Sequence, residues 1–61
     1  MSDHDDEIER DARQMIEQYG EAAARIARLR AEIAENNIHN LRLARMWRAV
    51  AAAIEQLQRR S

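Results

Sequence analysis

The sequence predicts an all-α protein organised as an antiparallel two-helix hairpin. Its 61 residues include no proline, threonine, lysine or phenylalanine and a single glycine, a composition that favours helix and disfavours strand. Apolar residues recur at steps of three and four along most of the chain, which is the period of an α-helix. One cluster of asparagines separates two such segments. The whole chain, residues 1–61, is therefore expected to be a single small helical domain.

The first helix is expected over about residues 4–36. Acidic residues at its start suit the positive end of a helix dipole. A seam of apolar residues at alternating steps of four and three is formed by Ile8, Ala12, Met15, Tyr19, Ala22, Ile26, Leu29 and Ile33. A flanking stripe, Ile16, Ala23, Ala27 and Ala34, makes the apolar face wide enough for two helical neighbours.

Gly20 leaves two arrangements open. Glycine costs about 1 kcal/mol relative to alanine in a helix interior, so the chain can break there and form a three-helix bundle. Against a break, the seam keeps its phase through Gly20, and no Ser, Thr, Asn or Asp follows to cap a new helix. We expect one long helix with a kink and keep the three-helix bundle broken at Gly20 as the alternative.

The chain is expected to reverse over about residues 36–40, because asparagine adopts turn conformations readily. Asn40 is the expected N-cap of a second helix over about residues 41–59, with Asn37 as a second possibility. This second helix carries the strongest apolar stripe of the chain, made of Leu43, Trp47, Val50, Ile54 and Leu57.

The chain carries Tyr-Gly-Glu-Ala-Ala at 19–23, Arg-Ala at 30–31, and Trp-Arg-Ala-Val-Ala-Ala-Ala-Ile-Glu-Gln-Leu at 47–57. With these elements it resembles a group of short uncharacterised helical proteins from alphaproteobacteria. The resemblance covers most of residues 12–58 and departs at the turn, where this chain has His39-Asn40 in place of Gly-Asp. It implies a helical fold and no activity that can be assigned to any residue.

The inventory of reactive side chains argues against an enzyme. There is no cysteine, lysine or threonine, and the serines, Ser2 and Ser61, lie at the chain ends. No cofactor or metal is expected. Glu35 and His39 are four residues apart, whereas the di-iron Glu-x-x-His pattern places them three apart. Removal of Met1 would give Ser2-Asp3-His4 a square-planar donor set for Cu(II) or Ni(II).

Charge is divided unevenly along the chain. Residues 1–21 hold eight acids and two arginines, a net −6, and residues 22–61 hold eight arginines and three glutamates, a net +5. An arginine patch at the turn end of the hairpin predicts nucleic-acid binding through phosphates as the alternative function. The patch consists of Arg28, Arg42, Arg45 and Arg48. An acidic N-terminus and the lack of a long apolar run predict a cytoplasmic protein without membrane contact.

The leading prediction is a small non-catalytic interaction module, either a self-assembling scaffold or a regulator that docks on a larger protein. A chain this short buries little core, and oligomerisation is one remedy. We expect a homodimer of two hairpins, a head-to-tail four-helix bundle in which the acids of one copy face the arginine patch of the other. The expected interface residues are Ile16, Ala23, Ala27, Ala34, Trp47, Val50 and Ile54.

Overall fold

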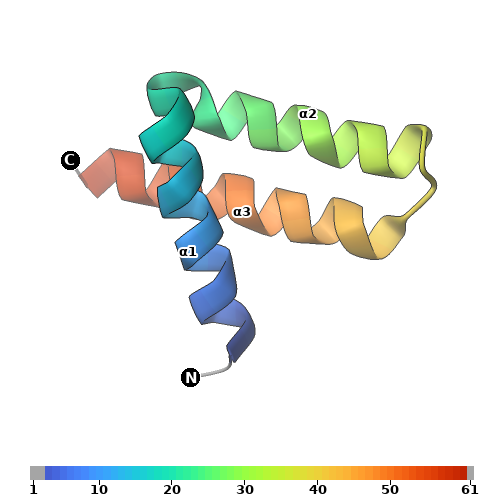
Figure 1. The fold of residues 1–61 in the computed structure, drawn as a ribbon, viewed down its shortest axis with the longest axis horizontal. Coiled ribbons are helices and arrows are strands. Elements are labelled where there is room, and N and C mark those ends of the chain that lie inside the picture. The colour runs from blue at the N-terminus through green and yellow to red at the C-terminus, as the bar shows by residue number, and fades with distance from the viewer. Residues whose placement is uncertain (1–2, 61) are drawn as a thin grey trace.

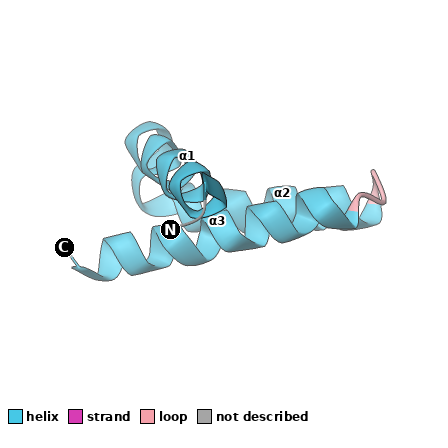
Figure 2. Ribbon diagram, turned by 90° about the horizontal axis from the view of Figure 1, so that it is seen from below, coloured by secondary structure: helices cyan, strands magenta, loops and turns pink. Residues whose placement is uncertain are grey.

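The protein is all-helical, with two antiparallel helices and a third that crosses them. The computed structural model describes residues 3–60. The elements are α1 (Asp3–Tyr19), a 3₁₀ turn η1 (Gly20–Ala22), α2 (Ala23–Asn36) and α3 (Leu41–Arg60). α2 and α3 form a hairpin, and α1 crosses α3 at a steep angle (Figure 1). Seen edge-on in Figure 2, α2 and α3 form one layer and α1 lies on one side of it.

The predictions of an all-α chain and of a hairpin are confirmed for residues 3–60, but the expected continuous helix over about 4–36 is wrong. Gly20 has a φ of +59°, in the left-handed region that glycine adopts without steric cost. α1 therefore ends at Tyr19, and the chain folds back through η1. The break gives α1 a partner within its own chain, because Ala12 and Met15 become buried where α1 crosses the hairpin.

The break also decides which face of α2 is the core face. Ala23, Ala27, Ala31 and Ala34 are buried. Leu29 and Ile33, which belong to the predicted seam, are 54% and 41% exposed. The flanking alanine stripe therefore packs against α3, where small side chains allow close approach of the two helices, and the second half of the seam lies at the surface.

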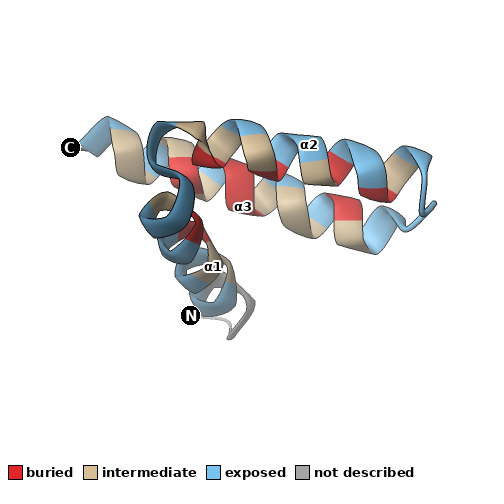
Figure 3. Cartoon of the chain, turned by 45° about the horizontal axis from the view of Figure 1, so that its top comes forward, coloured by how far each residue is buried: buried red, intermediate tan, exposed pale blue. Residues whose placement is uncertain are grey.

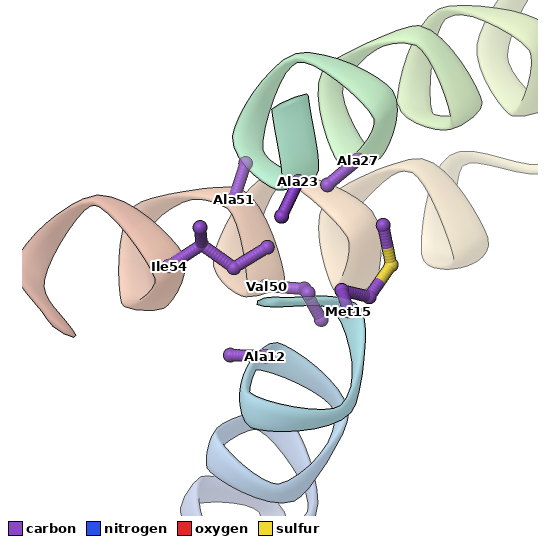
Figure 4. Close-up of a cluster of buried hydrophobic side chains, with 7 residues drawn as sticks. All are labelled: Ala12, Met15, Ala23, Ala27, Val50, Ala51 and Ile54. Atoms are coloured by element: carbon purple, nitrogen blue, oxygen red, sulfur yellow. The ribbon is translucent and has the colours of Figure 1, made fainter. Parts of the chain in front are cut away.

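The core lies where the three helices meet (Figures 3 and 4). It is a cluster of Ala12, Met15, Ala23, Ala27, Val50, Ala51 and Ile54. Among the described residues, seven of the ten buried apolar side chains are alanines, and the largest that are fully enclosed are Ile54 and Val50. Hydrophobic stabilisation is roughly proportional to the apolar area buried. Because alanine side chains are small, this core contributes less stabilisation than the same number of larger apolar residues would.

The turn between α2 and α3 is fixed by local hydrogen bonds. The Leu43 N–H donates to Asn40 Oδ1 at 3.0 Å, which confirms Asn40 as the N-cap of α3. The Asn40 N–H donates in turn to the Ala34 carbonyl at 2.8 Å. The left-handed residue of this turn is His39, with a φ of 58°, rather than an asparagine. These contacts set how far α3 runs back along α2.

No helix within residues 3–60 combines the length and the hydropathy that crossing a bilayer requires.

The conformation of Gly20 gives a direct test of the fold. Gly20→Ala is expected to destabilise the monomeric chain by about 1–2 kcal/mol, because an alanine in the left-handed region brings its Cβ too close to the following carbonyl. Chemical denaturation followed by circular dichroism at low micromolar concentration measures the change. Glu17→Ala, an exposed substitution on α1, is the control. A more stable monomer would mean that Gly20 is helical.

Candidate functional site

Most of the residues predicted to form an intersubunit interface are enclosed within the single chain. Five of the seven are at most 1% exposed: Ala23, Ala27, Ala34, Val50 and Ile54. A second copy cannot reach them while the chain keeps this fold, so they do not form a contact surface of the folded-back chain. The apolar faces were identified correctly, but their neighbour is another helix of the same chain. Ile16 and Trp47 are half-buried and pack against the core cluster.

One apolar surface of the hairpin is only partly covered by α1. α1 packs on the second half of α3, around Val50 and Ile54, so the turn half of the same side has no helix over it (Figures 1 and 2). We name this surface the open face. Its residues are Leu29 and Ile33 of α2 and Leu43, Met46 and Ala49 of α3.

Helical spacing and contacts place both groups of residues on the side where α1 lies. On α2, Arg30 reaches Met15 and Tyr19 of α1. Ile33 follows Arg30 by three residues and Leu29 by four, so Ile33 lies next to Arg30 on the helix surface, and Leu29 lies beyond Ile33 and further from α3. On α3, Leu43, Met46 and Ala49 line a hollow together with residues of α1.

This hollow lies in the corner between α1 and the first half of α3. It has a volume of about 500 Å³, and Ile8 of α1 completes its apolar lining. Glu7 and Asp11 border it on α1, and Arg42 and Arg45 border it on α3. An apolar groove with acidic and basic borders suits an amphipathic helix, whose apolar face can enter the groove while its charged residues meet the borders.

Arg30 joins the three helices at the edge of the open face. Its guanidinium carbon lies 5.0 Å from the centroid of the Trp47 ring and 5.7 Å from that of Tyr19. Arg30 Nη2 donates to the Tyr19 hydroxyl at 3.1 Å, and Nη1 lies 3.7 Å from Met15 Sδ. Each cation–π contact contributes about 0.5–2 kcal/mol, depending on burial. Arg30 thus holds the end of α1 against the hairpin.

Sequence reasoning assigned no contact to Arg30. The sequence offered no clear signal, because Arg30 is one of five arginines between the only tyrosine and the only tryptophan of the chain. Helical spacing cannot bring these residues together, because each belongs to a different helix. Only the fold-back at Gly20 places Tyr19 and Trp47 on the same guanidinium.

The predicted arginine patch is divided by the fold. Arg28 forms an ion pair with Glu55, and Arg48 forms one with Glu35, in each case between α2 and α3. Arg42 and Arg45 instead border the hollow. Two of the four guanidinium groups therefore already have carboxylate partners. This pairing lowers the charge that the patch offers to a phosphate backbone.

The metal sites weighed from the sequence find no geometric support. Glu35 is engaged by Arg48, and no group of three or more His, Cys, Asp or Glu side chains that could hold a metal occurs among the described residues. Ser2, which the copper or nickel arrangement needs, lies outside the described residues.

No protein-family model, curated protein or solved structure matches this chain. The resemblance to short alphaproteobacterial proteins therefore stays a prediction, and arguments about function rest on the geometry described above.

The junction at Arg30 gives a second prediction. Arg30→Ala is expected to lower the free energy of unfolding by about 1–2 kcal/mol, because it removes two cation–π contacts and the hydrogen bond to Tyr19. Trp47 emission should also shift to longer wavelength as its ring becomes more exposed. Urea denaturation followed by Trp47 fluorescence reports both effects. Arg25→Ala, an exposed arginine on the same helix, is the control, and equal effects of the two variants would contradict the role of Arg30.

The buried alanine stripe gives a third prediction. Ala27→Glu is expected to unfold the monomer, because an unpaired carboxylate enclosed in the core costs about 3–5 kcal/mol, much of the stability of a small domain. Circular dichroism at low micromolar concentration measures the loss of helix. Leu29→Glu introduces the same charge two residues along at an exposed position and should leave the monomer folded. A folded Ala27→Glu monomer would show that this stripe is not the core.

Proposed function

We propose that this chain is a small non-catalytic interaction module that acts as a homodimer through its open face. The observation that carries the proposal is the exposure of Leu29 and Ile33, 54% and 41%, on a side of the hairpin that α1 covers only in part. Large aliphatic side chains gathered beside an apolar groove are typical of a protein-binding surface.

The small core supports the same proposal. A chain of this length leaves a large fraction of its surface exposed, and most of what it buries is alanine. Covering Leu29, Ile33, Leu43 and Met46 would bury side chains larger than most of those now enclosed. Association therefore adds hydrophobic stabilisation that the single chain lacks.

Charge supports a second copy as the partner. The two borders of the hollow have opposite sign, Glu7 and Asp11 on α1 and Arg42 and Arg45 on α3. In a two-fold symmetric dimer each copy presents the same surface to the other. The acidic border of one copy can then meet the basic border of the other, twice, and this favours a defined orientation.

A matched pair of leucine substitutions tests the proposal. Light scattering and sedimentation from micromolar to millimolar concentration should show a dimer for the natural sequence. Leu29→Gln should raise the dimer dissociation constant about a hundredfold, because one buried leucine per copy is lost and each contributes about 1.5–3 kcal/mol. Leu41→Gln is the control, since Leu41 is 59% exposed but lies about 200° around α3 from Leu43.

Two results would contradict the proposal. A particle of 7.1 kDa throughout the concentration range would exclude self-association. A dimer weakened equally by Leu29→Gln and Leu41→Gln would show that the open face is not the contact.

A further inference from the structure

We propose that the dimer forms when α1 leaves its own hairpin: Gly20 straightens, α1 and α2 become one helix, and α1 of each copy lies along the open face of the other. This inference rests on the proposed self-association and deepens it, because it names the segment that covers the open face and the hinge that releases it.

The seam of α1 and α2 is regular in its spacing. Its residues run in steps of four and three through Gly20 as though the helix were continuous: Ile8, Ala12, Met15, Tyr19, Ala22, Ile26, Leu29 and Ile33. The folded-back chain uses this pattern only in part. Ala12 and Met15 are buried, whereas Tyr19, Leu29 and Ile33 are exposed. A continuous helix would bring all eight onto one line.

The seam is also symmetric about the bond between Gly20 and Glu21. Its spacings are four, three, four, three, four, three and four, the same from either end. Two continuous helices lying antiparallel would therefore bring every seam residue opposite a seam residue of the other copy. The facing pairs would be Tyr19 with Ala22, Met15 with Ile26, Ala12 with Leu29, and Ile8 with Ile33.

These pairs match the surface that is left open in the single chain. Leu29 and Ile33, the exposed apolar residues of α2, would be covered by Ala12 and Ile8 of the other copy. The small alanine opposite Leu29 leaves room for the larger side chain. α1 of the other copy would then run along the turn half of the hairpin, beside Leu43 and Met46.

Gly20 is the hinge of this exchange. A Cβ placed on Gly20 would meet no atom within 4 Å, so the strain of an alanine at this position comes from the left-handed backbone and not from a clash with a neighbour. Neither Tyr19 nor Ala22, at the starts of η1 and α2, makes a capping hydrogen bond with its side chain. The fold-back is held instead by contacts between helices. The Gln58 side-chain amide donates a hydrogen bond to the Gly20 carbonyl at 2.9 Å, and Arg30 donates one to the Tyr19 hydroxyl.

Charge is divided between α1 and the hairpin. α1 contains seven acidic residues and two arginines, whereas α2 and α3 together contain eight arginines and three glutamates. In the single chain Glu7 and Asp11 border the same hollow as Arg42 and Arg45. Laid along the hairpin of a second copy, these acids would come to the corresponding arginines of that copy, so the exchange keeps the opposite charges together.

Gly20→Ala provides the first arm of the test. Alanine disfavours the left-handed hinge and favours a continuous helix. The dimer dissociation constant should therefore fall by about tenfold or more, with the helix retained by circular dichroism. Gln18→Ala, an exposed substitution near the hinge, should leave the constant unchanged. Adding Leu29→Gln to Gly20→Ala should weaken the dimer again.

A distance measurement provides the second arm. The chain has no cysteine, so Glu9→Cys and Gln56→Cys can carry two spin labels. In the folded-back chain both positions line one surface hollow. The doubly labelled chain is diluted into an excess of unlabelled chain at a concentration where the dimer forms. Release of α1 should lengthen the distance within one chain by about 15–20 Å, from the rise of 1.5 Å per helical residue.

The outcomes separate this inference from the proposal on which it rests. A monomer at every concentration overturns both. A dimer that keeps the short distance between positions 9 and 56, and that Gly20→Ala weakens, overturns the release of α1 but leaves self-association through the open face in place. A long distance together with a tighter Gly20→Ala dimer supports the inference.

Discussion

The left-handed backbone of Gly20 is the constraint on which the rest of this structure depends. Because its φ is +59°, the chain leaves the helical path at Tyr19 and α1 crosses α3 instead of extending beyond it. The crossing buries Ala12 and Met15 against Val50 and Ile54. It also leaves the turn half of the hairpin without a third helix. One backbone angle thus decides which apolar residues form the core and which form the surface.

The alanine stripe of α2 explains both the compactness of the hairpin and its weakness. Alanines at 23, 27, 31 and 34 let α2 approach α3 closely enough for Arg28 to reach Glu55 and for Arg48 to reach Glu35. These pairs are largely exposed, and exposed pairs contribute only about 0–1 kcal/mol each. They select the register of the two helices and stabilise the hairpin little. In the dimer proposed above, a second copy would add hydrophobic stabilisation to that of this small core.

The parts of the fold that could be predicted from the sequence are those set by local chemistry. The N-cap at Asn40 and the buried residues Val50 and Ile54 of α3 follow from capping and from helical period. The break of the helix at Gly20 does not follow from local chemistry. A glycine in a helix interior costs about 1 kcal/mol, which is less than the contacts between helices contribute. These contacts decide whether the chain breaks at Gly20, and a seam that continues in phase does not reveal them.

The candidate site was harder to predict for the same reason. A helical pattern shows which residues are apolar but not which neighbour covers them. Ala27 was therefore predicted as an intersubunit contact and Leu29 as a residue of the seam, whereas the fold encloses Ala27 and leaves Leu29 at the surface. The pair Arg48–Glu35 spans 13 residues and Arg30 touches aromatic rings from two other helices. Neither follows from the spacing rules of a single helix.

The glycine at position 20 also affects the balance between the folded-back chain and the continuous helix. Alanine or another helix former would favour the continuous helix, and a residue that strongly breaks helices would exclude it. Glycine adopts both conformations at a cost of about 1 kcal/mol in the helix and almost none in the left-handed region. The local preference is therefore small, and contacts between helices decide which form is populated. Contacts within one chain do not depend on concentration, whereas contacts between copies do, so in the proposed dimer a rising protein concentration would favour the extended chain over the folded-back one.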